Sequence, residues 1–189
     1  MRTFTLFLFF LLSFMLSFGQ KETPNLPIDS STNKITYAEV INVDSLTSKQ
    51  ELYSRAREWF AKTYNSSKEV LQMEDKESGK IIGKALIQVY YKMLGMDHEH
   101  GYINYTITIA VKDGKYKYEI TDLHHKGQFV QDGMSPSYGL CENMINSGTS
   151  RQKLYNYCLY TADKGIKNLI IDLKSAMNIK SIINTKENW

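Results

Sequence analysis

The chain has 189 residues, with 23 lysine and arginine residues against 20 aspartate and glutamate residues and a formal net charge of +3. This length suits one domain with a sizeable core, and the near balance of charge favours neither nucleic-acid binding nor strong attraction to a membrane surface. The sequence has no nucleophile motif, phosphate-binding loop or paired-cysteine metal signature, so it points to no particular reaction, and we expect no cofactor.

Residues 1–20 have the pattern of a secretory signal peptide. Arg2 precedes an apolar run of 15 residues that begins at Phe4, and small residues follow near Gly19. As a helix this run would span about 22 Å, against about 30 Å for a bilayer core, which favours cleavage near Gly19 or Gln20 over a permanent anchor. We therefore expect an exported protein, periplasmic or secreted, with no transmembrane span after cleavage.

The next segments predict a lead-in, a strand and a helix. Residues 21–33 hold two of the three prolines and many turn formers, which is typical of a flexible, exposed lead-in. A β-rich run from Ile35 to Val43 predicts the first strand. Ser48 and Glu51 then form a capping box for an amphipathic helix. Its apolar face recurs with helical spacing at Leu52, Ala56, Trp59 and Phe60.

Four β-rich runs follow this helix: "KEVLQMED", "KIIGKALIQVYYK", "GYINYTITIAVK" and "KYKYEITDLHH". Asp113 and Gly114 join the last two runs as a tight hairpin, which places Lys112 opposite Lys115 and fixes the register. The predicted apolar pairs are Val111 with Tyr116, Ile109 with Tyr118, and Ile107 with Ile120. The predicted polar pairs are Thr106 with Thr121, Thr108 with Glu119, and Ala110 with Lys117. One face of the sheet should therefore be buried and the other largely polar.

Residues 126–148 lack a clean period and predict a long connection, with a helical turn near "YGLCENMI". A final helix follows, and Gly165 is expected to kink or split it. Its apolar positions are Leu154, Cys158, Ala162, Ile166, Leu169, Ile170, Leu173 and Met177. The two cysteines, Cys141 and Cys158, could form a disulfide or remain reduced, and the sequence leaves both possibilities open.

The order strand, helix, four strands, helix predicts a single α+β domain over residues 34–178, followed by a tail over residues 179–189. In this two-layer arrangement, two helices cover one face of a curved antiparallel sheet, and the second face is open to water.

Three stretches also resemble a known family: "ITYAEVINVDSLTSKQELYSRAREWFAKTY", "GKIIGKALIQVYY" and "YTITIAVKDGKYKYEITDLHH". The positions that match its pattern are Val43, Ser48, Glu51, Leu52, Tyr53, Arg55, Ala56, Glu58, Trp59, Phe60, Gly83 and Ala85. The stretches resemble exported bacterial envelope proteins classed as a domain of unknown function with a TBP-like fold. The resemblance implies that fold over roughly residues 30–125, but it implies no activity, substrate or catalytic residue, because function resides in sites and not in folds.

The open sheet face is the leading candidate for a binding surface, because it combines hydroxyl, amide and charged groups that suit an envelope protein, a peptide or a glycan. The candidate residues are Lys84, Gln88, Tyr90, Thr106, Thr108, Lys117 and Glu119. No nucleic-acid partner is expected, because the face lacks the phenylalanine wedges that unstack bases and export removes chromosomal DNA as a partner. A solvated face that binds nothing is the alternative.

Four histidines in two short stretches, "MDHEHGY" (96–102) and "HHK" (124–126), raise the question of a metal site. The hairpin register predicts the pairs His124 with Ile103 and His125 with Tyr102, so both stretches lie at one end of the sheet. Neighbours on a strand point to opposite faces, so at most one histidine of the second stretch can join a one-sided cluster, and "DHEH" is expected in a loop. The sequence thus favours a non-catalytic binding module, with a metal-assisted hydrolase at the histidine end as the alternative and no metal ligand assigned.

Overall fold

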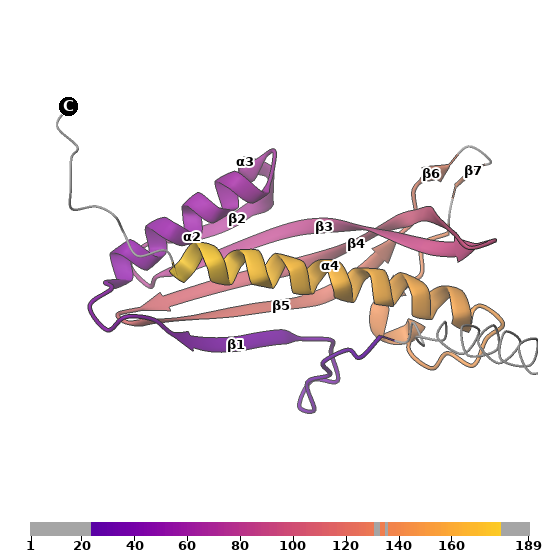
Figure 1. Ribbon diagram of the computed structural model, residues 1–189, viewed down its shortest axis with the longest axis horizontal. Coiled ribbons are helices and arrows are strands. Elements are labelled where there is room, and N and C mark those ends of the chain that lie inside the picture. The colour runs from indigo at the N-terminus through magenta and orange to yellow at the C-terminus, as the bar shows by residue number, and fades with distance from the viewer. Residues whose placement is uncertain (1–23, 131–132, 135, 179–189) are drawn as a thin grey trace, which may run out of the picture.

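The computed structural model describes residues 24–130, 133–134 and 136–178, which form two layers (Figure 1). One layer is an antiparallel sheet of six strands. Its strands lie in the spatial order β1 (Tyr37–Asn42), β5 (Lys115–Lys126), β4 (Met96–Lys112), β3 (Lys80–Met93) and β2 (Leu71–Asp75), and β8 (Gly139–Leu140) pairs with β5. Two long helices cover one face of this sheet, so the predicted α+β architecture is confirmed.

The helical layer consists of α2 (Lys49–Thr63) and α4 (Gln152–Asn178), with a short α3 (Ser67–Val70) after α2. As predicted, Ser48 caps α2, because its side chain accepts a hydrogen bond from the Glu51 N–H at 3.2 Å. The Trp59 indole N–H donates to Asp172 at 2.8 Å and joins the two helices. The sheet face below them contributes a continuous apolar core with side chains such as Ile107, Ile109 and Ile120, which are completely buried.

Gly165 neither splits nor ends α4, which runs unbroken from Gln152 to Asn178. The expectation of a split was wrong because this glycine serves packing. A Cβ atom at Gly165 would lie 2.2 Å from Ile87 Cδ1, so the missing side chain lets α4 approach β3 closely.

The hairpin register is confirmed from Lys112–Lys115 as far as Thr106–Thr121 and fails beyond that pair. At Asp122, which has a φ of 57°, the register shifts by one residue. The observed pairs after this bulge are His124 with Asn104 and His125 with Ile103, so the two predicted histidine pairs were wrong. One extra residue in β5 exchanges the faces on which the following side chains lie, and therefore His125 points into the core.

The stretch "DHEH" lies within β4. The expectation that it forms a loop was therefore wrong. Strand β3 continues to Met93 and β4 begins at Met96, so only Leu94 and Gly95 form the turn between them. A second register shift follows Gln88 and turns His100 toward the helical layer. The polar composition of this stretch concealed its strand character, because the usual alternation of apolar and polar residues is missing there.

The long connection contains a small hairpin of β6 (Phe129–Val130) and β7 (Gly133–Met134), then β8 and a 3-10 turn η2 (Cys141–Met144). The predicted helical turn is therefore confirmed. Cys141 and Cys158 are both buried, free thiols.

The ends of the chain are described only in part. The predicted signal peptide (1–20) and tail (179–189) lie outside the described residues. Within the predicted lead-in, residues 24–33 are mostly exposed, and Ile28 forms a β-bridge with Ile35. No helix among the described residues has the length and apolar character needed to span a bilayer.

Candidate binding site on the open sheet face

The structure brings five of the seven predicted binding residues together on the sheet face that the helices leave open. Lys84 pairs across strands with Thr106, and Thr108 pairs with Glu119. The Lys117 ammonium and the Glu119 carboxylate form an ion pair at 2.7 Å along the same face. Because β-strand side chains alternate, these residues lie opposite the buried positions of β3, β4 and β5.

The other two predicted residues, Gln88 and Tyr90, lie farther along β3. The Gln88 side-chain amide donates to the Gly101 carbonyl at 2.8 Å, so it supports the backbone beside the β4 bulge. Tyr90 pairs with Glu99, whose carboxylate accepts a hydrogen bond from the Gln128 amide at 2.9 Å. The side chains of Gln88 and Glu99 at this end of the face are thus engaged within the domain.

The same face carries a lysine cluster of which the sequence-based candidates included only Lys84 and Lys117. We define it as Lys80, Lys84, Lys112, Lys115 and Lys117, all of which are exposed. Lys80 and Lys117 lie in one row across the sheet, separated only by Ala110, and Lys112 lies directly opposite Lys115. Alternation along the strands already places all five on the open face, so the sequence did contain the signal.

The lysine cluster is poorly neutralised. Of its members, only Lys117 forms an ion pair with another described residue. Like charges directly opposite each other on neighbouring strands repel, so the pairing of Lys112 with Lys115 costs stability. On α2, Arg55, Arg57 and Lys62 each pair with a glutamate. The lysine cluster is therefore a group of five cations with a single ion pair among the described residues, in a chain whose formal net charge is only +3.

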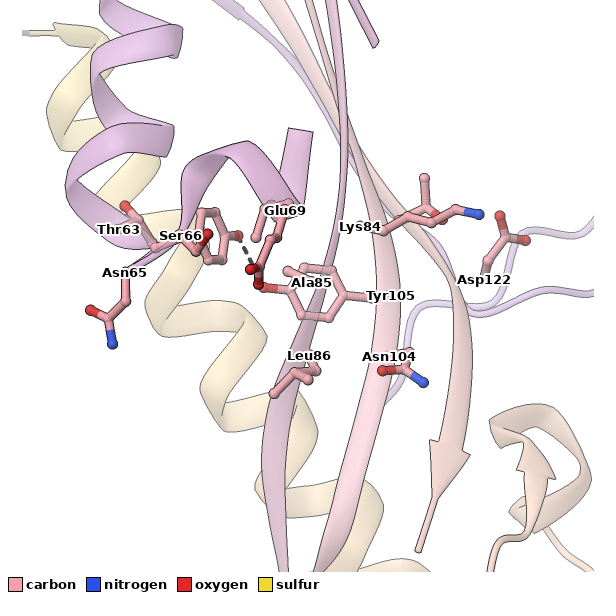
Figure 2. A pocket seen from close by; sticks show the side chains of 13 residues that line it. Thr63, Asn65, Ser66, Glu69, Lys84, Ala85, Leu86, Asn104, Tyr105 and Asp122 are labelled. Carbon is pink, nitrogen blue, oxygen red and sulfur yellow. Dashed lines mark hydrogen bonds between the residues drawn. The ribbon is translucent and has the colours of Figure 1, made fainter. Parts of the chain in front are cut away.

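A groove of about 940 Å³ adjoins the lysine cluster at the edge of β3 (Figure 2). It opens where β2 ends, because β2 pairs with β3 only from Lys80 to Gly83. From the helical side it is lined by Thr63, Tyr64, Asn65, Ser66, Glu69 and Val70, and from the sheet by Lys84, Ala85, Leu86, Asn104, Tyr105, Thr106 and Asp122. Figure 2 shows Lys84 and Asp122 on one side of the strands and Ser66 and Glu69 on the other.

The hydroxyl groups of Tyr64 and Tyr105 form a hydrogen bond at 3.1 Å in this groove (Figure 2). Burial raises the pKa of both phenols above the ordinary value of 10. Both hydroxyls therefore remain protonated at neutral pH and can donate or accept hydrogen bonds, but they do not act as bases.

Two of the four histidines form a buried, neutral cluster with Tyr138. His125 accepts a hydrogen bond from the Tyr138 N–H at its Nδ1 (3.3 Å) and donates from its Nε2 to the His100 carbonyl (2.9 Å). Nε2 of His100 lies 2.9 Å from the Tyr138 hydroxyl. Burial lowers the pKa of His125 to about 4 and also lowers that of His100. His124, by contrast, is exposed on the open face, so the prediction that neighbouring histidines separate is confirmed.

This cluster does not form a metal centre. Within the described part of the chain, no group of three or more histidine, cysteine, aspartate or glutamate side chains is placed to hold a metal ion. Both ring nitrogens of His125 already have protein partners. The metal-assisted hydrolase considered from the sequence therefore has no support from the geometry.

Residues 37–126, which include β1 to β5, match the family model described as a domain of unknown function with TBP-like fold, DUF4468. Over these residues the chain is similar to the DUF4468 family. This confirms the resemblance to a domain of unknown function with a TBP-like fold. The match ends at Lys126, so α4 and the connection before it lie beyond the matched region.

Two solved structures support the TBP-like fold. A TBP-like protein from Parabacteroides distasonis has a TM-score of 0.61 at 20% identity, covering 80% of this chain and 96% of that chain. A DUF4468 family protein from Bacteroides ovatus has a TM-score of 0.59 at 14% identity, covering 86% and 94%. No curated protein sequence matches significantly. At these identities the likeness shows the fold alone, and the function must be argued from the surface.

Proposed function

We propose that the domain is a non-catalytic binding module whose open sheet face holds an acidic polysaccharide. The observation that supports this most strongly is the lysine cluster, in which four of five ammonium groups have no ion-pair partner among the described residues. An anionic polymer would neutralise several of these groups at once and relieve the repulsion between Lys112 and Lys115.

The neighbouring side chains favour a polysaccharide over a folded protein. Thr106, beside Lys84, and Thr108, beside Glu119, place hydroxyl groups on the same face, where they can exchange hydrogen bonds with sugar hydroxyls. Protein interfaces usually have an apolar core with a few aromatic anchors. The large exposed apolar side chains on this face instead lie singly on four strands, at Val40, Met73, Leu86 and Leu140.

The predicted export of the protein agrees with a polysaccharide ligand. The first 20 residues predict export, and an exported domain would meet acidic polysaccharides of the cell envelope. A peptide or envelope protein on the same face, and a solvated face that binds nothing, are the competing outcomes.

The test compares two double charge reversals. Lys84→Glu with Lys115→Glu changes the lysine cluster, whereas Lys68→Glu with Lys164→Glu makes the same change in net charge at exposed positions of α3 and α4. Binding of polygalacturonate is measured by titration calorimetry, with neutral dextran and an oligonucleotide as comparison ligands. The cluster variant should lose about tenfold or more in affinity for polygalacturonate, and the control about twofold or less.

Equal losses in the two variants would show that the binding follows net charge and not the open face. Tighter binding of the oligonucleotide would indicate that the ligand is a nucleic acid and not a polysaccharide. No binding of any of the polymers by the wild-type chain would leave the solvated face as the conclusion.

A further inference from the structure

The turn between β3 and β4 exposes three large apolar side chains. Met93 is 47% exposed, Leu94 is 90% exposed and Met96 is 61% exposed. Met93 pairs with Met96, so Leu94 and Gly95 alone form the turn, and we call these four residues the apolar tip. The tip lies at one end of the sheet, near the first turns of α4 (Figure 1). An apolar patch on a projecting turn is typical of a site that meets another surface.

Leu94 is poorly suited to its place in the turn. Its φ is 52° and that of Gly95 is 81°, so both turn residues adopt left-handed conformations. Two-residue hairpins with this geometry prefer asparagine followed by glycine, because asparagine tolerates a positive φ better than leucine does. Leu94 is thus both strained and almost fully exposed, and folding alone explains neither property. Local rules are usually broken where a residue serves function.

Cationic side chains surround the apolar tip. A hollow of about 620 Å³ behind it is lined by Met93, Arg151, Lys153 and Tyr157, among others. Arg151 and Lys153 are exposed there. Asp97, which follows Met96 in β4, accepts a hydrogen bond from the Tyr157 hydroxyl at 2.6 Å. The surroundings of the tip therefore favour an anionic partner.

We propose that the apolar tip inserts into an anionic phospholipid surface, with Leu94 among the acyl chains and Arg151 and Lys153 against the headgroup phosphates. Apolar side chains flanked by lysine and arginine are the usual means by which proteins bind the interface of a bilayer without crossing it. The tip is a projecting turn with apolar groups at its end and cations behind them, which matches the order of layers in a membrane surface. This site is separate from the lysine cluster and does not depend on the polysaccharide proposal.

The experiment uses the chain without its first 20 residues, because that apolar segment would itself bind lipid and the described fold begins at Pro24. Cosedimentation is measured with vesicles of phosphatidylglycerol and phosphatidylcholine, and with vesicles of phosphatidylcholine alone. Leu94→Asn removes the apolar group and introduces the preferred turn residue. Leu46→Asn is the matched control, because Leu46 is also 90% exposed but lies in the loop between β1 and α2.

Leu94→Asn should lower partitioning onto the anionic vesicles about tenfold or more, and Leu46→Asn should leave it unchanged. Arg151→Gln with Lys153→Gln should weaken binding to anionic vesicles only. At about 0.5 M salt, where contacts of the lysine cluster are screened, the difference between wild type and Leu94→Asn should persist. Leu94→Asn should also raise the melting temperature, because it relieves the strained turn.

Three results would overturn the lipid proposal. Equal vesicle binding by the two leucine variants would remove the role of the tip. A lower melting temperature for Leu94→Asn would give Leu94 a structural role instead. A concentration-dependent dimer that Leu94→Asn abolishes, without vesicle binding, would assign the tip to a second copy of the chain. The double variant Lys84→Glu with Lys115→Glu changes only the lysine cluster, and Leu94→Asn changes only the tip. The polysaccharide and lipid proposals can therefore fail independently of each other.

Discussion

Acidification should destabilise the domain through His125. Its side chain is fully buried, and both ring nitrogens are engaged in hydrogen bonds that require the neutral ring. A second proton would go to Nδ1, where it would displace the hydrogen bond from the Tyr138 N–H and place a charge in the core. Burial therefore lowers the pKa of His125 from 6.5 to about 4.

The sign and size of the effect follow from this pKa. The unfolded chain binds the proton more readily than the folded chain does, so His125 contributes stability that is fully present above about pH 6.5 and is lost as pH falls toward 4. The free energy of unfolding should fall by up to about 2 kcal/mol near pH 5 and up to about 3 kcal/mol below pH 4. His100, whose pKa is also lowered, acts in the same direction.

Urea unfolding at about pH 7 and about pH 5 measures this loss. His125→Gln should be less stable at neutral pH, but its pH dependence over this range should be smaller than that of wild type by about 2 kcal/mol. His124→Gln is the matched control, because this histidine on the same strand is exposed, so the variant should be about as stable as wild type at neutral pH. Equal losses of stability by wild type and His125→Gln between the two pH values would rule out His125 as the source of the pH dependence.

Three further predictions concern the packing of α4, the cap of α2 and the two buried thiols. Gly165→Ala should destabilise the domain by about 1–2 kcal/mol in urea unfolding. Adding Ile87→Val, which removes the crowded Cδ1 atom, should recover most of the loss. If Gly165→Ala were more stable than wild type, the approach of α4 to β3 would not be tight. Ser48→Ala should lower the free energy of unfolding by about 1 kcal/mol, and no change would contradict the capping role. Burial raises the pKa of Cys141 and Cys158 to about 12, so a thiol reagent should label neither cysteine in the folded protein and both after unfolding; rapid labelling of the native chain would disprove their burial.

Much of the fold could be predicted because local signals agreed with one another. The Asp113–Gly114 turn and the alternation in the flanking strands fixed the pairing from Lys112 to Thr106. The predicted register failed beyond Asp122, where β5 has a bulge. A bulge depends on how the strand packs against its neighbours, and no pattern in the local sequence predicts this one. Because of this one extra residue, His125 pairs with Ile103 instead of Tyr102, and its side chain lies in the core.

The candidate site was predictable in outline. Alternation assigned Lys84 and Lys117 to the open face, but the near-neutral charge of the whole chain obscured the grouping of five lysines there. The burial of His100 and His125 could not be foreseen, because their partner Tyr138 comes from the long connection, which has no clear periodicity.

Binding of an acidic polysaccharide to the open sheet face can be followed by NMR, with polygalacturonate added stepwise and the chemical shifts of the backbone amide groups recorded. We expect the largest chemical-shift changes at the residues of the lysine cluster and at Thr106 and Thr108 on the same face. Shifts confined to α2 and α4, or a spectrum that does not change, would contradict the polysaccharide proposal.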